Sequence, residues 1–410
     1  MLLIALAGKP NCGKSTFFKS LTLANVEIAN YPFTTIDANK GVAYVRSACP
    51  CKELGVADTC TQCVDGVRFT PVELLDVAGL VPDAHLGRGL GNQFLDNLRE
   101  ADAIIQVVDA SGSTDAEGNP VDIGTRNPKE DVEFLRYEFA MWMAGIIQKH
   151  LPRLVRQAQN REPVLIDLLG GALAGLRISP VEIREAVDEC GINLAKATEE
   201  EIAELAAVLL RVSKPMIIAA NKADQASEEN LAALKEMGAV PTIAAGELAL
   251  KSAASGKLLH YLPGDASFAP VEGAKLSAPQ VKALTMIAEN MKKLGSTGVQ
   301  DTLNKVVFEE LGMIIVYPFL SLLLTSRFGF SDTEASFIVV IASGLSNVGS
   351  IIGGKLADAW SRKYVFLIAA ACVCVVMTLA GFFVDSMVCV LLIMVSYLAV
   401  NAVLPTVSAM

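Results

Sequence analysis

A glycine-rich octapeptide near the start of the chain constrains the fold more than any other feature of the sequence. Residues 8–15 read Gly-Lys-Pro-Asn-Cys-Gly-Lys-Ser and fit the pattern G-x-x-x-x-G-K-[ST]. The apolar run MLLIALA precedes them, and the helix-compatible run TFFKSLTLA follows. This is the strand–loop–helix setting in which backbone N–H groups of a glycine-rich loop surround phosphates. The motif therefore predicts a phosphate-binding loop in an α/β domain.

The residues of this loop have different expected roles. Backbone N–H groups and the amino end of the following helix face the phosphates. Lys14 is expected to reach the β- and γ-phosphates and to act in catalysis, while Ser15 is expected to bind Mg²⁺. The predicted nucleotide-binding residues of the loop are Gly8, Asn11, Cys12, Gly13, Lys14, Ser15 and Thr16.

Two later segments carry residues for the metal and the γ-phosphate. In YPFTTI, Thr35 is predicted to close over Mg²⁺ and the γ-phosphate, although Thr34 would serve equally well. In VELLDVAGL, an apolar strand ends at Asp76, a predicted Mg²⁺ ligand, and the Gly79 N–H can contact the γ-phosphate. Thr35 and Gly79 are thus predicted to act in catalysis beside Lys14.

The fourth element concerns the base. The run KPMIIAANKAD is a buried-strand pattern that ends in N-K-x-D, formed by Asn221, Lys222 and Asp224. The Asp224 carboxylate can accept hydrogen bonds from the two N–H groups on the edge of guanine, whereas adenine offers no such pair. GTP is therefore predicted over ATP.

With four elements in this order, the chain resembles the Obg-like GTPases, specifically the YchF branch, over about residues 1–318. The resemblance also rests on the phrases DVAGLVPDAHLGRGLGNQFLDNLREADAIIQVVDASG, GELALKSA, HYLPGD and GSTGVQDTLNKVVF. It implies a cytoplasmic GTPase domain that uses Mg²⁺, binds GTP and GDP, and acts on a ribosome-like partner.

Several positions modify what the resemblance implies. Leu80 follows the glycine of switch II, where many GTPases carry a water-positioning glutamine, so slow intrinsic hydrolysis is expected. Asn11 is expected either to contact a monovalent cation such as K⁺ or to shape the loop by a hydrogen bond. His85 is expected to be solvent-exposed, with a swing toward the γ-phosphate as the alternative. Two departures from the family pattern are Asp83, in place of glycine, and Ile243-Ala244-Ala245, in place of Ser-Ala-Glu.

Four cysteines in two close pairs lie between YPFTTI and VELLDVAGL, the two segments predicted to act as switches I and II. Cys49-x-Cys51 and Cys60-x-x-Cys63 can each form a turn with both sulfur atoms facing one point, which predicts a tetrahedral Zn²⁺ site. The alternatives are a redox pair and reduced surface thiols. No secretory signal accompanies the nine cysteines of the chain, which favours a reducing compartment.

Charge and hydropathy divide the chain into two parts. The formal net charge is −10, yet residues 319–410 contain only four Lys/Arg and four Asp/Glu. The acidic first part gives no electrostatic reason to expect sequence-blind nucleic-acid binding, and no sequence-specific DNA binding is expected either. From about residue 131 to residue 212, apolar residues recur at helical spacing, which predicts a helical insertion in the G domain.

The last 92 residues read as a membrane segment. Uncharged runs at 335–354, 364–384 and 386–410 are long enough to cross a bilayer, and a partial first span is expected at 311–326. The sequence GKLADAWSRK at 354–363 resembles the cytoplasmic loop signature of the major facilitator superfamily, and its basic residues place it on the cytoplasmic side.

The expected fold class is an α/β P-loop NTPase G domain with a helical insertion, followed by all-α transmembrane helices, about four with the first one partial. The expected parts are 1–130 (with a Cys-rich insert at 47–65), 131–212, 213–318 and 319–410. The leading functional hypothesis is a slow GTPase with a membrane-embedded tail. The alternatives are a partial transporter with a fused nucleotide-binding head, an artificial or frame-joined chimera, and a binding switch. Four membrane helices cannot form the two-repeat cavity that alternating access requires.

Overall fold

The computed structural model describes residues 2–23, 35–37, 39–49, 51, 60, 63–77, 79–80, 82–86, 98–159, 161–176 and 178–310. The fold given below is that of one compact unit formed by residues 1–49 and 62–313. The expected transmembrane helices, the transporter-like loop at 354–363 and residues 31–34 lie outside the described residues.

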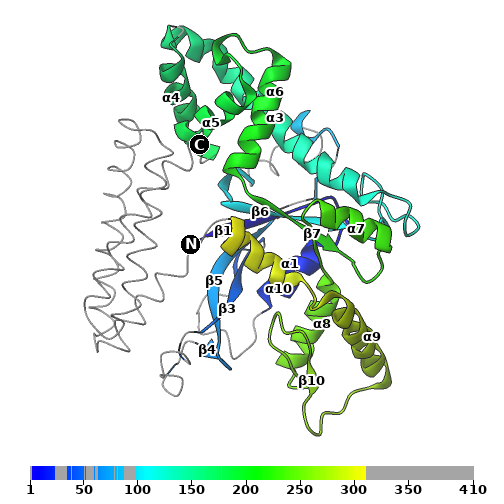
Figure 1. The fold of residues 1–410 in the computed structure, drawn as a ribbon. Coiled ribbons are helices and arrows are strands. Elements are labelled where there is room, and N and C mark those ends of the chain that lie inside the picture. Colours follow the sequence, from blue (N-terminus) through cyan, green and yellow to red (C-terminus); the bar gives the residue numbers. More distant parts are fainter. Residues whose placement is uncertain are drawn as a thin grey trace. The chain divides into compact units, whose positions relative to one another are not determined.

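A central sheet organises this unit (Figure 1). Its strands are ordered β2-β3-β5-β1-β6-β7-β8, with β4 paired to β5. The neighbouring pairs among β5, β1, β6, β7 and β8 are all parallel, whereas β2, β3 and β4 form antiparallel pairs. The bounds are β1 Leu3–Ala7, β2 Thr35–Asp37, β3 Lys40–Ala48, β4 Cys63–Val64, β5 Val67–Asp76, β6 Ala103–Asp109, β7 Met216–Asn221 and β8 Val240–Pro241. The predicted α/β P-loop fold is therefore confirmed.

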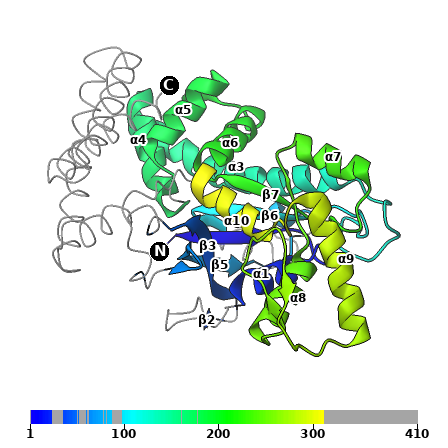
Figure 2. The same cartoon turned by 60° about the horizontal axis from the view of Figure 1, so that its bottom comes forward.

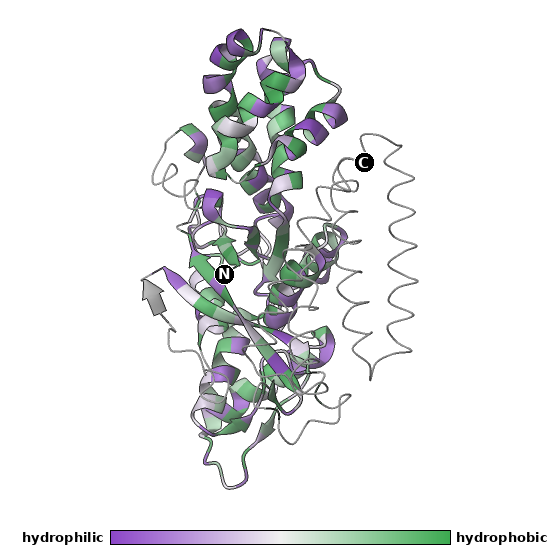
Figure 3. Cartoon of the chain, turned by 90° about the vertical axis from the view of Figure 1, so that its left-hand side faces the viewer, coloured by the Kyte–Doolittle hydropathy of each residue, from purple (hydrophilic) through white to green (hydrophobic). Residues whose placement is uncertain are grey.

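The two faces of the sheet bury different side chains of the same strands. Along β1, Leu3, Ala5 and Ala7 belong to one core cluster, while Ile4 and Leu6 belong to another, as the two-residue period of a strand requires. The first cluster includes helix α3 (Pro128–Ala158), and the second includes α1 (Lys14–Thr22) and α10 (Val299–Lys305). Figure 3 shows how hydrophobic residues concentrate along the strands.

A helical layer follows β6 and returns the chain to β7 (Figure 1). Two of its helices begin with a capping box: Ser179 with Glu182, and Thr198 with Glu201. Such caps satisfy N–H groups that a helix leaves without an internal acceptor. Besides α3, the layer contains α4 Glu162–Leu173, η3 Ala174–Leu176, α5 Pro180–Cys190, η4 Leu194–Lys196 and α6 Glu199–Ser213.

The remaining elements follow β7 (Figure 2), and α7 (Glu228–Glu236) contacts α3 of the helical layer. Helix α8 packs on α1, and α10 contacts β3 and β7. These elements are α7 Glu228–Glu236, α8 Ala244–Ser255, β9 Leu259–His260, β10 Ala269–Pro270, α9 Ala278–Leu294, α10 and the π-helical turn η5 Val306–Glu310.

Within the described part of the chain, no helix taken singly has the length and apolar character to cross a membrane. Two consecutive segments, Glu162–Leu176 and Pro180–Cys190, pass that test only when they are taken together. The chain bends by 115° between them.

Candidate functional site

Four parallel strands deliver their last residues to one edge of the sheet. Strand β1 leads into the glycine-rich loop, β5 ends at Asp76, β6 at Asp109 and β7 at Asn221. Ligands of open α/β sheets bind outside the carboxyl ends of the strands, where successive connections diverge to the two faces. The motifs found along the sequence therefore share one edge.

The loop after β1 can be built only with glycine at two positions. A Cβ atom on Gly8 would lie 2.4 Å from the Val107 carbonyl oxygen. Gly13 has φ of +91°, and a Cβ there would lie 2.3 Å from the Asn221 side-chain nitrogen. The glycines thus let the loop pass close to β6 and β7 before α1 begins at Lys14.

Charged and hydroxyl groups meet at the amino end of α1. The Lys14 Nζ lies 2.5 Å from Asp76 Oδ1, and the Ser15 hydroxyl donates to Asp76 Oδ2 at 3.2 Å. Ser15 is exposed, and the Lys14 side chain remains 10% exposed. A carboxylate and a hydroxyl are oxygen ligands of the kind that Mg²⁺ prefers. These three residues are brought together as the sequence predicts.

The segment after β5 is anchored to the loop through its backbone. A Cβ atom on Gly79 would lie 2.8 Å from the Pro10 nitrogen, and the Leu80 N–H donates to the Gly8 carbonyl at 3.1 Å. The Leu80 side chain is 1% exposed and belongs to the core cluster that contains α3. It therefore points into the core. Thr35 is the first residue of β2, and its side chain lies outside the described residues.

Asn11 and Cys12 serve the loop through contacts with protein groups. The Asn11 Nδ2 donates to the Gly118 carbonyl at 3.0 Å, which is the loop-shaping hydrogen bond foreseen as one of its two roles. Asn11 also has φ of +59°, a conformation that asparagine tolerates. Burial raises the pKa of the Cys12 thiol to about 11, so this group stays protonated at neutral pH. Thr16, in the first turn of α1, is half-buried.

At the other end of the edge, Asn221 joins three segments. Its Nδ2 donates to the Cys12 carbonyl at 3.1 Å, and its Oδ1 accepts from the Ala244 N–H at 3.1 Å. The turn Ile243-Ala244-Ala245 thus lies beside the N-K-x-D motif although its side chains differ from the family pattern. Asp224 is exposed at this end.

Lys222 is held by a carboxylate that the sequence reading did not single out. Its Nζ donates to Asp109 Oδ2 at 2.8 Å, and Asp109 also accepts from Ser111, Ser113 and Thr114. Burial raises the Asp109 pKa, but the hydrogen bonds from Lys222, Ser111 and Ser113 outweigh it and leave the pKa lowered. The sequence does contain a pattern that could have identified Asp109, because this acidic residue ends an apolar strand, as Asp76 does.

Three of the phrases that carry the family resemblance converge on one buried carboxylate, Glu247 of α8. It accepts from the Tyr261 hydroxyl at 2.6 Å and from the Thr297 hydroxyl at 2.5 Å. Burial raises the Glu247 pKa and lowers that of Lys251 to about 8. The Lys251 Nζ donates to the carbonyls of Ser20 and Leu21 near the end of α1. This network ties α8 to the helix that follows the phosphate loop.

The four predicted metal-binding cysteines are brought together. The sulfur atoms of Cys49, Cys51, Cys60 and Cys63 all lie within 4.8 Å of one another. Sulfur atoms about 2.3 Å from a shared tetrahedral Zn²⁺ ion stand about 3.8 Å apart, so this spacing suits such an ion.

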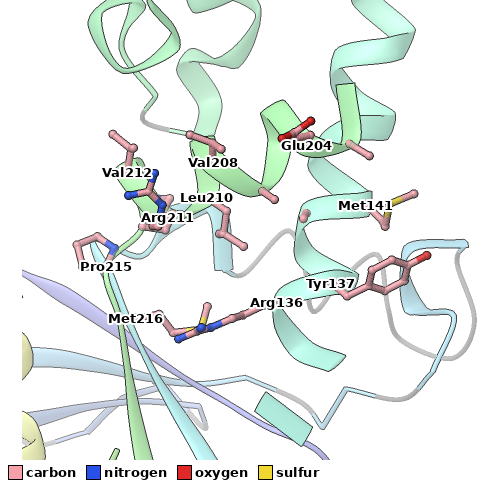
Figure 4. A pocket seen from close by; sticks show the side chains of 14 residues that line it. Arg136, Tyr137, Met141, Glu204, Val208, Leu210, Arg211, Val212, Pro215 and Met216 are labelled. Atoms are coloured by element: carbon pink, nitrogen blue, oxygen red, sulfur yellow. The ribbon is translucent and has the colours of Figure 1, made fainter. Parts of the chain in front are cut away.

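A pocket of about 760 Å³ lies elsewhere, between α3 and α6 (Figure 4). Its lining includes Tyr137, Met141, Glu204 and Arg211, together with Lys214–Met216 at the start of β7. The pocket adjoins the amino end of β7, so it is separate from the strand-end site, which lies at the carboxyl ends of β1, β5, β6 and β7. Met141 and Trp142 of α3 are half-buried, whereas Met143 is fully buried.

His85 differs from its leading expectation. Its side chain is 13% exposed, not solvent-exposed, because its Nδ1 lies 2.7 Å from Glu138 Oε2 of α3. Sequence reasoning missed Glu138, as it missed Asp131 beside Lys9, because each pair joins segments far apart in the chain.

The fold and the strand-end motifs define a nucleotide-binding protein of the P-loop class. A family described as "50S ribosome-binding GTPase" matches residues 3–136, and one described as "Obg-like GTPase YGR210-like, G4 motif-containing domain" matches residues 219–320. An uncharacterized GTP-binding protein of Methanocaldococcus jannaschii is 48% identical over 325 residues, which cover 78% of this chain and 81% of the relative. An uncharacterized GTP-binding protein of Schizosaccharomyces pombe is 33% identical, covering 77% of this chain and 81% of the relative.

Two further comparisons bear on the branch of the class. The ribosome-binding ATPase YchF of Bacillus subtilis is 32% identical over 247 residues, which cover 58% of this chain and 62% of that protein. The crystal structure of a GTP-binding protein from Pyrococcus horikoshii superposes with a TM-score of 0.56 at 33% identity, covering 75% of this chain and 78% of that one. The chain belongs to the YchF/Obg-like P-loop GTPases.

Proposed function

We propose that the chain binds GTP with Mg²⁺ and hydrolyses it to GDP at the carboxyl edge of the sheet. The observation that carries this proposal is the meeting of Lys14, Ser15 and Asp76 at the amino end of α1. In the bound state Lys14 would contact the β- and γ-phosphates, and Ser15, Asp76 and Thr35 would hold Mg²⁺. The Gly79 N–H faces the γ-phosphate. The backbone N–H groups of Gly8 and of residues 11–16 surround the remaining phosphate oxygens.

Guanine selection rests on Asp224 in this proposal. The similar proteins include some named for GTP and others named as ATPases, so the base must be decided from this chain's residues. Asn221 and Lys222 are held by protein partners, and exposed Asp224 is available to the two N–H groups on the guanine edge.

The direct test is equilibrium binding of fluorescent GTP and ATP to the full chain in mild detergent. We expect GTP to bind at least about tenfold more tightly, as the loss of one good hydrogen bond predicts. Equal or tighter binding of ATP would contradict the guanine assignment.

Intrinsic hydrolysis is proposed to be slow, with a rate constant on the order of 10⁻³ s⁻¹ or less. Leu80 occupies the position of the water-orienting glutamine, and its side chain is buried in the core. A single-turnover measurement in KCl and in NaCl tests this rate and also the proposed K⁺ contact of Asn11. A rate above about 1 s⁻¹ without any partner would contradict the proposal.

A ribosome is the proposed partner, because two relatives with this G domain are named for ribosome binding. Co-sedimentation with purified ribosomes in GDP or in a non-hydrolysable GTP analogue tests it. We expect nucleotide-dependent sedimentation, and equal recovery with and without ribosomes would contradict the assignment.

Zn²⁺ is proposed for the cysteine cluster, because its four sulfur atoms all lie within 4.8 Å of one another. Metal analysis of protein purified under reducing conditions should find about one zinc per chain. Cys49→Ser should remove it, whereas Cys190→Ser, outside the cluster, should not.

The membrane-embedded tail remains a prediction from the composition of residues 319–410. Carbonate extraction of membranes should leave the full chain in the pellet if these residues insert. Intact Lys14, Ser15, Asp76 and Asp224 favour a GTPase over a transporter fragment with an inactive head.

A further inference from the structure

Helix α3 contacts the proposed nucleotide site at two points, each through a buried acidic residue. Asp131 and Glu138 are 5% and 3% exposed, and they are seven residues apart, so they share one face of the helix. Buried Leu135 lies between them on that face. Acidic residues are seldom buried to this extent unless they are paired.

The first point holds the phosphate loop. The Lys9 Nζ lies 2.6 Å from Asp131 Oδ2 and donates to the Thr114 carbonyl at 2.8 Å. The Arg126 Nε donates to Asp131 Oδ1 at 3.0 Å. The Lys9 and Asp131 side chains are 2% and 5% exposed, so this pair fixes the start of α3 against the loop.

The second point holds the segment after Leu80, which corresponds to switch II. Glu138 Oε1 accepts from the Asp83 N–H at 2.9 Å, and Oε2 accepts from the His85 N–H at 2.9 Å. The same Oε2 lies 2.7 Å from His85 Nδ1. One carboxylate therefore contacts two backbone N–H groups and one side chain. The His85 ring also packs edge-on against the Tyr137 ring, with the ring centroids 5.9 Å apart.

The same helix continues into the helical layer. Leu80 and Ala84 of the switch segment share a core cluster with Phe139 and Met143 of α3, and with residues of α4, α5 and α6. A displacement of residues 83–85 would leave Glu138 buried without its three partners, which is unfavourable unless α3 adjusts too. The contact thus joins the segment that senses the γ-phosphate to the helical layer.

We propose that Glu138 is a positioning residue that couples switch II to α3, so that the helical layer responds to whether GTP or GDP is bound. This inference rests on the proposed function. The fixed end of the coupling is the Lys9–Asp131 pair, and the moving end is the set of Glu138 contacts to Asp83 and His85.

Tryptophan fluorescence offers a test, because the chain contains only Trp142 and Trp360. Trp142 lies one helical turn beyond Glu138 and packs against Phe139 at 5.5 Å. In the full chain carrying Trp360→Phe, emission is recorded with GDP and with a non-hydrolysable GTP analogue. Glu138→Ala is compared with Glu133→Ala, which removes an exposed acid from the same helix.

We expect a difference in emission between the two nucleotides that Glu133→Ala retains and Glu138→Ala loses by more than half. Glu138→Gln, which keeps the volume and one acceptor oxygen, should give an intermediate value and guards against a folding defect of the alanine variant. His85→Ala added to Glu138→Ala should cause no further loss.

Nucleotide affinity, measured on the same samples, separates the two proposals. Since Glu138 touches no predicted nucleotide ligand, its variants should bind GTP within about threefold of the parent chain. Binding without any difference in Trp142 emission, or an unchanged difference in both Glu138 variants, would overturn the coupling alone. Absence of GTP binding by the parent chain would overturn the proposed function and the coupling with it.

Discussion

The two ends of the strand-end site are built differently. At the base end, Asn221 and Lys222 are hydrogen-bonded to the Cys12 carbonyl, the Ala244 N–H and Asp109. At the phosphate end, Lys14 and Ser15 are hydrogen-bonded to Asp76. Ser15 and Asp76 are both predicted ligands of one Mg²⁺ ion. Contacts at the base end can persist when a nucleotide binds, whereas those at the phosphate end must be exchanged for phosphate and metal. Substitutions at the phosphate end should therefore act mainly on nucleotide affinity, whereas loss of a protein contact at the base end should lower the free energy of unfolding.

The largest effect is expected at the phosphate end. Lys14→Ala removes charge-assisted hydrogen bonds worth about 1.5–3 kcal/mol each, so GTP affinity should fall about 100- to 1,000-fold. The fall in the unfolding midpoint should be small beside this effect, because Asp76 keeps the Ser15 hydroxyl as a donor and its side chain stays 17% exposed to water. Equilibrium binding and thermal unfolding measure the two effects, with Lys19→Ala, exposed on the same helix, as the control. An unchanged affinity would remove Lys14 from the site.

At the base end, Asp224→Asn should change which base is preferred. Asparagine replaces an acceptor by an N–H donor, so affinity for GTP should fall about 10- to 100-fold while affinity for xanthosine triphosphate rises. Competition binding with both nucleotides measures the change, and Glu229→Gln, another exposed acid, should leave both affinities as they are. If Asp224→Asn leaves the preference unaltered, Asp224 does not contact the base.

Asp109→Asn tests whether the base end is held by protein contacts. Asp109 is fully buried and holds Lys222, so its loss should lower the free energy of unfolding by about 2 kcal/mol at neutral pH. The folded-state pKa is lowered, so this stabilisation is present above the usual pKa of aspartate, near 4. It should disappear as the pH falls through the lower folded-state value. Denaturant unfolding of both proteins from pH 7 to pH 3 tests this, and a difference independent of pH would contradict it.

The contrast between the two ends also explains how far the sequence could be read. The phosphate loop, Asp76 and the N-K-x-D motif follow from runs of a few residues, because a strand pattern next to a turn fixes where each side chain emerges. The α/β fold and the family followed from those runs. Partners of Lys222 and His85 did not, because Asp109 and Glu138 lie 113 and 53 residues away from them in the chain. Only the packing of β6 and α3 against these segments makes such pairs.

The smallest effect is expected at Asn11, where it distinguishes the two roles foreseen for this residue. Its hydrogen bond to the Gly118 carbonyl is exposed on the Asn11 side, so Asn11→Ala should lower the free energy of unfolding by about 1 kcal/mol or less. If Asn11 also contacts a cation beside the phosphates, hydrolysis by the parent chain should be faster in KCl than in NaCl, and the variant should lose that difference. Single-turnover rates in the two salts at equal ionic strength measure this. If the rate difference between KCl and NaCl persists in Asn11→Ala, Asn11 only shapes the loop. Its hydrogen bond to Gly118 would then be a contact between protein groups that persists when a nucleotide binds, as at the base end.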